Sequence, residues 1–134
     1  RYNFDLCNDL SNLLNRTVSM KNKYFGGRVP KYNGQINEID KEFEEFTLNQ
    51  INKFEEKMNE YEIANSLQEI WSIISRTNKY IDETSPWILA KDEANKEKLK
   101  SCIYHLVENL RKIAILIKPF MNDTAENIFR QLER

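Results

Sequence analysis

Glycine, proline, histidine and cysteine are all scarce in this chain of 134 residues, which has three Gly, three Pro, one His and two Cys. Glycines at 26, 27 and 34 cannot form a G-x-G-x-x-G fingerprint or a Walker loop, and one histidine cannot form an H-E-x-x-H zinc motif. Cys7 and Cys102 lie far apart without zinc-knuckle or framework spacing. The usual sequence signatures of catalysis are therefore excluded, and we expect no catalytic centre, metal or cofactor here.

The chain also lacks an apolar run near the roughly 20 residues that a membrane span needs. Two isolated thiols without a secretory leader are typical of a reducing, cytoplasmic protein. The sequence starts at Arg1 rather than Met and stops inside a helical pattern at 126–134. We therefore expect a single domain cut from a longer protein, with no membrane partner.

Charge is nearly balanced overall but unevenly distributed. The net charge is −1, yet residues 1–37 carry six Lys/Arg against two Asp/Glu, and residues 38–62 carry three against nine. A general nucleic-acid binder would be basic, because neutralising phosphates drives non-specific affinity. If this domain binds nucleic acid, we expect a few specific contacts placed away from the acidic segment.

Hydrophobic periodicity predicts helices throughout and no strand. The first helix carries an apolar stripe and ends at Gly26-Gly27, followed by a loop over 28–37. The second segment, about 38–60, has two apolar sets out of phase, which predicts a bend or break near 47–50. The stripe of the first helix consists of Leu6, Leu10, Leu13, Leu14 and Thr17.

Two further helices show the strongest patterns. One has a bundle-like seam and must end by about Thr84, because Pro86 disfavours the helical conformation at Ser85. Ser85 and Pro86 suit the N-cap and first position of a new short turn. The other, about 94–118, should be the most buried element and is stopped by Pro119, after which Thr124 could cap a short last helix. The first seam consists of Ile63, Leu67, Ile70, Ile74, Thr77 and Ile81. These patterns predict an all-α antiparallel bundle of four to five helices.

A polar stripe on the first helix is the first candidate site. Asn8, Asn12 and Arg16 recur every four residues and point away from the apolar stripe. Asparagine offers donors and an acceptor, and arginine offers a planar fork of donors, which are suited to reading base edges. The alternative is that these side chains are only solvated.

Trp87, just after the proline-enforced break, is the second candidate. An exposed tryptophan beside Arg76, Lys79 and Lys91 could stack on an unstacked RNA base. It could equally fill a gap in the core, as aromatic residues usually do. We expect Trp71 to be a core residue.

The remaining polar residues favour structural roles. His105 lies in an apolar helix with no evident catalytic partner, so we expect a core or boundary histidine. The carboxylates of 38–62 lack the Asp-rich loop with glycine of calcium sites and are expected to form a solvated face.

Taken together, several runs resemble the C-terminal anticodon-binding domain of bacterial methionyl-tRNA synthetases over essentially the whole chain. They are Asn12-Leu13-Leu14-Asn15-Arg16-Thr17, Lys23-Tyr24-Phe25-Gly26, Asn78-Lys79-Tyr80-Ile81-Asp82-Glu83-Thr84 and Pro86-Trp87-Ile88-Leu89-Ala90-Lys91. The resemblance implies a helical domain that reads the CAU anticodon of methionine tRNA for a ligase using ATP. Asn12 and Arg16 match the family's anticodon-reading pair, and Trp87 after Pro86 matches its base-stacking tryptophan. Asp82 matches an acid of the same run and could cap or tether the corner.

The ATP-binding signatures of the family, HIGH and KMSKS, are absent. The resemblance thus implies a non-catalytic piece, with ATP and methionine bound by a preceding catalytic domain against which it packs. Two alternatives stay open: the related domain of an isoleucine, leucine or valine synthetase, and an interaction bundle with no RNA role. Pro86-Trp87 followed by Ala90-Lys91 disfavours the first. DNA is not an expected partner.

Overall fold

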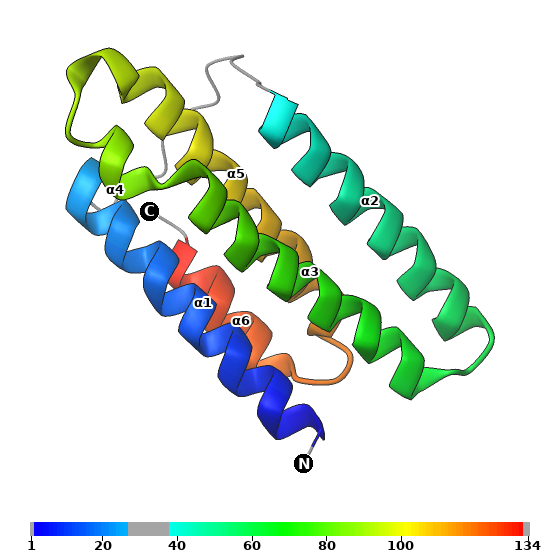
Figure 1. Cartoon of the computed structure of the whole chain (residues 1–134). Helices are drawn as coiled ribbons and strands as arrows, with labels where there is room; N and C mark the ends of the chain where they lie inside the picture. Colours follow the sequence, from blue (N-terminus) through cyan, green and yellow to red (C-terminus); the bar gives the residue numbers. More distant parts are fainter. Residues whose placement is uncertain (1, 27–37, 133–134) are drawn as a thin grey trace.

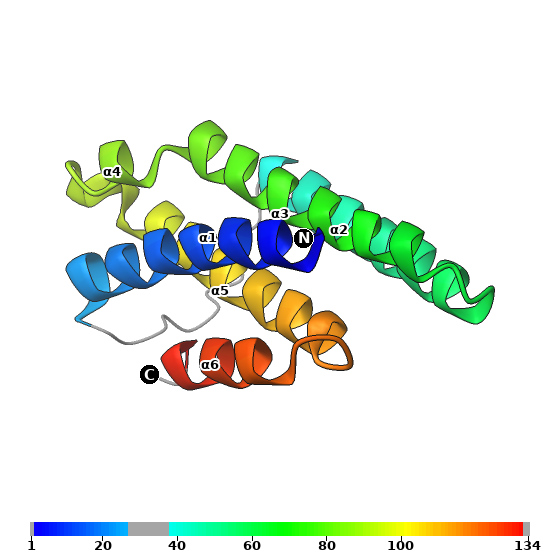
Figure 2. The ribbon, with the colours of Figure 1, turned by 90° about the horizontal axis from the view of Figure 1, so that it is seen from below.

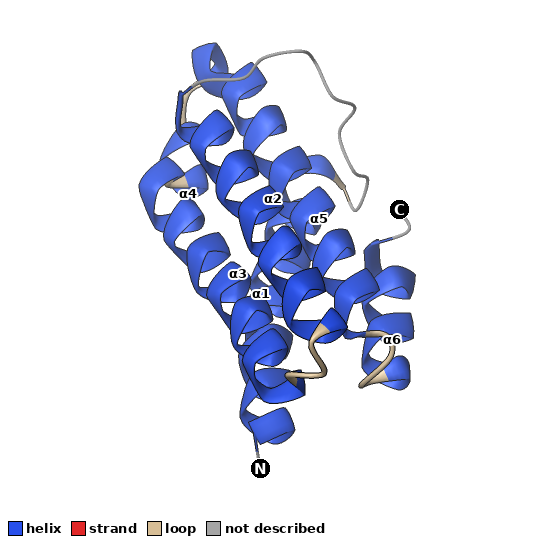
Figure 3. Cartoon of the chain, turned by 90° about the vertical axis from the view of Figure 1, so that its right-hand side faces the viewer, coloured by secondary structure: helices blue, strands red, loops and turns tan. Residues whose placement is uncertain are grey.

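All regular structure in residues 2–26 and 38–132, which the computed structural model describes, is helical (Figures 1 and 3). A four-residue helix α4 (Pro86–Leu89) and a 3-10 turn η1 (Glu93–Asn95) join the third long helix to the fourth. The long helices are α1 (Tyr2–Phe25), α2 (Glu38–Asn59), α3 (Ile63–Thr84), α5 (Lys96–Ile117) and α6 (Asn122–Leu132). The predicted all-α bundle is confirmed.

Helix α5 forms the centre of the bundle. It contacts every other helix and the turn η1, and Figure 2 shows it between the α2–α3 pair and α6. Because neighbours cover it on several sides, apolar residues such as Val107 and Ile113 are fully buried on a wide surface. The prediction that this helix is the most buried is confirmed.

The long helices alternate in direction along the chain. Consecutive long helices run antiparallel, so that α1 and α3, which are two apart, run parallel to each other (Figures 1 and 2). Helix α1 packs mainly on α3, α5 and α6 rather than on α2, its neighbour in sequence. The predicted antiparallel bundle is confirmed, and the parallel helices α1 and α3 share one face.

Helix α2 is continuous, so the predicted bend near 47–50 is wrong. Its buried stripe contains Phe43, Thr47, Gln50 and Phe54 at spacings of four, three and four residues. Two members of this stripe, Thr47 and Gln50, are polar. When only apolar residues are counted, the positions before and after these two therefore seem to lie on different faces of the helix. The helix stays straight because these positions keep the same face toward the core.

Several predicted boundaries need small corrections. The last helix begins at Asn122, so Thr124 lies in its first turn and does not cap it. Ile63 begins α3 and is half exposed, whereas the other members of its seam are buried. Gly26, with φ +61°, ends α1 as predicted, and α5 ends before Pro119. The predicted loop over 28–37 lies outside the described residues.

Within the described parts of the chain, no helix is long and apolar enough to cross a membrane. The same residues contain no group of three His, Cys, Asp or Glu side chains placed to hold a metal ion.

Candidate nucleic-acid interface

Helix α1 separates an apolar face from a polar one. Leu6, Leu10, Leu13, Leu14 and Thr17 are buried, whereas Asn8, Asn12 and Arg16 are exposed. The separation follows from a 3.6-residue repeat, which places the two sets on opposite sides of the helix. The predicted orientation of the polar stripe is confirmed.

Arg16 is held in place by two side chains of α3. Its Nη1 donates a hydrogen bond to Asn78 Oδ1 at 3.3 Å, and its Nη2 lies 3.7 Å from Asp82 Oδ1. The guanidinium carries five N–H donors, so these contacts leave donors for a ligand. Its side chain is 45% exposed. Arg16 is therefore oriented by α3 and still accessible.

Asp82 has a clear structural role at this point. Its carboxylate pairs with Arg16, and its main-chain carbonyl accepts a hydrogen bond from Ser85 Oγ at 3.0 Å. Of the two roles that the sequence left open, the carboxylate thus performs the tether, joining α3 to α1. The pair is solvent-exposed, so it orients Arg16 more than it stabilises the fold.

The corner after α3 presents Trp87. Ser85 adopts a left-handed conformation with φ 46° and ψ 66°, and its N–H donates to the Ile81 carbonyl at 2.9 Å. Ser85 and Pro86 occupy the predicted N-cap and first positions of α4, although the Ser85 hydroxyl bonds Asp82 rather than capping α4. Pro86 is buried, so it positions the corner and offers little surface to a ligand.

Trp87 is 42% exposed. A core tryptophan would be covered, so this exposure argues against the packing role that sequence alone left open. Because much of the Trp87 surface is accessible at the corner formed by Ser85 and Pro86, the side chain is available to a planar ligand.

A second link between α1 and α3 was missed by sequence reasoning. Trp71 Nε1 donates to Asp9 Oδ2 at 2.7 Å, and Trp71 is only partly buried. Trp71 packs against the core cluster, as expected, but it is only partly buried because its indole lies at the α1–α3 boundary. Asn78 was also missed as a partner of Arg16, although it lies one turn before Asp82 on the same helix face.

A buried polar cluster lies behind this face, between α2, α3 and α5. Asp40 accepts hydrogen bonds from Tyr80 Oη and, at 3.1 Å, from Ser101 Oγ. Asp40 is only 2% exposed. The prediction that the carboxylates of 38–62 form a solvated face is therefore wrong for Asp40, which a long-range partner draws into the core.

His105 belongs to the same cluster and is buried, as expected. Its Nε2 lies 2.7 Å from Glu44 Oε1 and its Nδ1 lies 2.7 Å from the Ser101 carbonyl oxygen. Ser101 Oγ also lies 3.3 Å from Nδ1. His105 therefore ties α5 to α2.

Burial dominates the acid–base properties of the cluster. It raises the pKa of the Cys102 thiol to about 12, and it raises the pKa of the Tyr80 phenol as well. Cys102 Sγ lies 3.2 Å from Thr84 Oγ1 at the end of α3. Both groups stay protonated at neutral pH. The cluster therefore surrounds Asp40 with uncharged hydroxyl and thiol groups.

The fold and the polar face shared by α1 and α3 indicate the class of protein to which this chain belongs. A helical bundle that presents asparagines, an oriented arginine and an accessible tryptophan has the equipment of an RNA-recognition domain, in which bases are read by polar forks and stacked on aromatic rings. Comparison with known proteins agrees. The family described as the anticodon binding domain of methionyl tRNA ligase matches residues 29–134, and the chain belongs to this family.

Individual relatives support the assignment. The chain is 52% identical to the methionine–tRNA ligase of Listeria monocytogenes serotype 4b (strain F2365) and 49% identical to that of Bacillus subtilis (strain 168), over 98% of its own length in each case. Each match spans 20% of the relative. The chain thus covers about a fifth of the length of these ligases.

Solved structures agree with the fold. The ligand-free methionyl-tRNA synthetase of Mycobacterium tuberculosis superposes with a TM-score of 0.85 and 30% identity, covering 96% of this chain and 26% of that one. The same synthetase bound by methionyl-adenylate also superposes with a TM-score of 0.85, at 31% identity. These matches favour the methionine family over the isoleucine, leucine and valine alternative.

Proposed function

We propose that this domain binds the anticodon loop of methionine tRNA and reads its CAU anticodon through the α1–α3 face. The observation that carries the proposal is Arg16, which is exposed on α1 yet oriented by Asn78 and Asp82 of α3. A pre-oriented guanidinium loses little conformational freedom when it binds, and its fork of donors distinguishes bases by their acceptor patterns.

The neighbouring residues supply the rest of the site. Asn12 lies one turn before Arg16 and can add a donor and an acceptor to the same base, while Asn8 extends the stripe. Trp87 offers its accessible indole for stacking, placed by the buried Pro86. Because the net charge is only −1, affinity comes from these specific contacts more than from general attraction to phosphate.

The larger activity is part of the same proposal. The Listeria ligase is about five times longer than this chain, and the solved structures include the M. tuberculosis synthetase bound by methionyl-adenylate. We place this domain in a cytoplasmic ligase that joins methionine to its tRNA using ATP. ATP is held by a separate catalytic domain on which this bundle packs. The bundle itself selects and tethers the tRNA and performs no chemistry.

The test is a titration of the full-length protein that contains this chain against tRNA transcripts with CAU or single-base variants in the anticodon. Arg16→Ala should weaken CAU binding by about ten- to hundredfold and reduce the preference for CAU, because a bidentate base contact is worth about 1–3 kcal/mol. Asn12→Ala should have a similar or smaller effect. Both residues are exposed, so melting temperatures should change little.

Ser11→Ala is the control, because Ser11 is exposed on the same helix outside the Asn8, Asn12 and Arg16 stripe. Methionine activation by ATP in the absence of tRNA is the second control and should be unaffected. Equal binding of all anticodons by the unmodified protein would refute the proposal, and so would Arg16→Ala binding like Ser11→Ala.

A further inference from the structure

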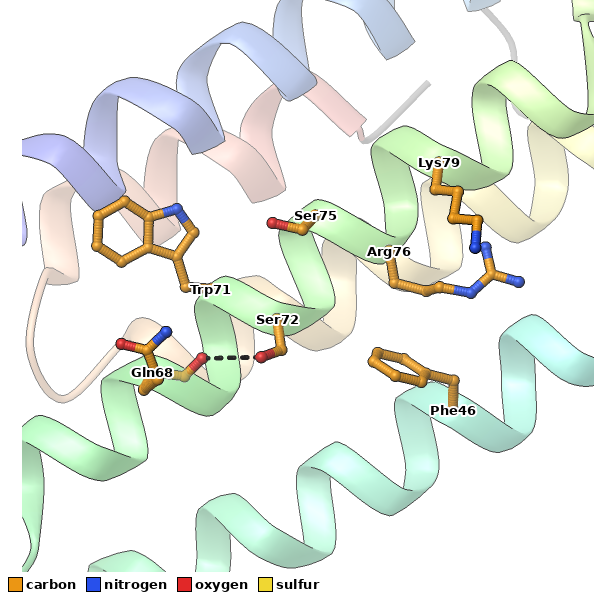
Figure 4. A pocket seen from close by; sticks show the side chains of 7 residues that line it. All are labelled: Phe46, Gln68, Trp71, Ser72, Ser75, Arg76 and Lys79. Atoms are coloured by element: carbon orange, nitrogen blue, oxygen red, sulfur yellow. Dashed lines mark hydrogen bonds between the residues drawn. The ribbon is translucent and has the colours of Figure 1, made fainter.

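A groove runs along the outer side of α3, next to the α1–α3 face. Its volume is about 590 Å³, within the range of small-ligand sites. Figure 4 shows that six of the labelled side chains come from α3 and that Phe46 reaches over from α2. The lining residues are Phe46, Gln68, Trp71, Ser72, Ser75, Arg76 and Lys79.

The lining is cationic in an otherwise acidic region. It contains two basic side chains and no carboxylate, although residues 38–62 carry an excess of acids. Arg76 is fixed, with its Nη1 3.0 Å from Glu83 Oε1 and its Cζ 5.6 Å from the centre of the Phe43 ring. Lys79 is exposed and makes no ion pair with a described residue. Lys79 therefore supplies the uncompensated positive charge of the groove.

The other end of the groove offers an aromatic ring. The hydrogen bond from Trp71 Nε1 to Asp9 fixes the plane of the indole. Between Trp71 and Lys79, about 12 Å along the helix, lie the hydroxyls of Ser72 and Ser75. An anchored aromatic ring, two hydroxyls and a free ammonium in a row match the base, ribose and phosphate of one nucleotide.

The groove is also continuous with the proposed anticodon surface. Trp71 is joined to α1 through Asp9, and Asn78, next to Lys79, is the partner of Arg16. A polynucleotide held by Arg16 thus has its neighbouring residues within reach of α3. Building on the proposed function, we propose that this groove binds a tRNA loop nucleotide that flanks the anticodon, with its phosphate at Lys79 and its base against Trp71.

The phosphate contact is tested by salt dependence. In the full-length protein, Lys79→Gln should weaken binding of the CAU transcript and lower the slope of log Kd against log salt by about 0.7, the value for one phosphate of a single strand. The preference for CAU over other anticodons should not change, because a phosphate contact carries no base information. Lys41→Gln, at an exposed position on the opposite side of α2, should behave like the unmodified protein.

The base contact is tested by changing the protein and the RNA in turn. Trp71→Leu should weaken binding at least about fivefold, whereas Trp71→Phe, which keeps an aromatic face, should retain most of the affinity. A transcript with an abasic residue immediately 5′ or 3′ of the anticodon should show the same loss with unmodified protein, which excludes misfolding as the cause. With Trp71→Leu, that abasic residue should cause no further loss.

The outcomes separate this inference from the proposed function. If Arg16→Ala loses the preference for CAU while Lys79→Gln keeps the full salt slope and no abasic position matters, the groove does not bind RNA. Loss of one contact without the other likewise overturns the single-nucleotide assignment. If the unmodified protein shows no preference among anticodons, the proposed function itself fails.

Discussion

Trp71 and Asp9 form the first of two side-chain hydrogen bonds between α3 and α1 that share the same register of the two helices. Trp71 Nε1 donates to Asp9 Oδ2 at 2.7 Å, and seven residues later on both helices Arg16 Nη1 donates to Asn78 Oδ1 at 3.3 Å. The members of both pairs are 62 positions apart in sequence. Equal separations require parallel helices, and this register places the polar stripe of α1 beside the outer side of α3.

The Asp9–Trp71 bond should contribute measurably to stability. Asp9→Leu should lower the free energy of unfolding by about 1–2 kcal/mol, because it removes the charged acceptor of a partly buried indole N–H. Asp9→Asn keeps an acceptor oxygen and should lose less than half as much. Urea denaturation measures both. Equal stability of Asp9→Leu and the unmodified chain would show that the bond does not hold the two helices together.

Truncation of Trp87 should weaken tRNA binding strongly but lower the stability of the fold less than loss of a core tryptophan would. Stacking on one base is worth about 1–3 kcal/mol, so Trp87→Ala should raise the tRNA concentration needed for aminoacylation by about ten- to hundredfold in the full-length protein. Because the side chain is half exposed, the stability loss should be well below the about 3–5 kcal/mol of a core tryptophan. Trp87→Phe should keep part of the tRNA affinity.

The measurements are aminoacylation against tRNA concentration and thermal melting of the same variants. Methionine activation without tRNA serves as the control and should be unchanged. A large fall in melting temperature with an unchanged tRNA requirement would reassign Trp87 to packing.

Apolar substitutions at the buried polar positions of α2 should maintain or raise the stability of the domain. Thr47 Oγ1 and Gln50 Oε1 are buried and have no hydrogen-bond partner among the described residues. Thr47→Val should therefore leave stability unchanged or raise it by about 1 kcal/mol, because it replaces an unsatisfied hydroxyl with a methyl group of similar size. Gln50→Met should act in the same direction. Denaturant midpoints measure the change, and a loss above about 1 kcal/mol for Thr47→Val would mean that the hydroxyl is bonded in solution.

High pH should destabilise the domain through Cys102. The folded thiol has a pKa of about 12 because of burial, against 9.0 for an ordinary thiol. Between these values the unfolded chain loses a proton that the folded chain keeps, so stability falls as pH rises, by at most about 1.4 kcal/mol per pH unit. Tyr80, whose pKa burial also raises, adds to the fall above its ordinary value of 10.0.

Cys102→Ala isolates this contribution. Its stability should decline less steeply between pH 9 and 11 than that of the unmodified chain, whatever the two absolute stabilities are. Urea denaturation at several pH values measures the two slopes. Identical slopes would show that the thiol ionises equally in both states.

Predictions that depended on neighbouring positions along the chain were largely confirmed. The helices, the opposite faces of α1, the stop before Pro119 and the break at Ser85 and Pro86 follow from periodicity and backbone sterics. The bend in α2 was predicted wrongly because a buried stripe was assumed to be apolar throughout. Asp40 was placed in solvent because its partners, Tyr80 and Ser101, are distant in sequence.

By itself, the sequence determined an all-α domain, the residues that face its core, and the polar side chains available to a ligand, because these depend on residues within a few turns of each other. Only the tertiary structure decided that α1 and α3 pack against each other, that Asn78 and Asp82 orient Arg16, and that Trp87 is accessible while Trp71 borders a groove. The physical reason is the separation along the sequence over which each kind of interaction acts. Helix periodicity is set by local hydrogen bonds, whereas register and exposure are set by packing between segments about sixty residues apart.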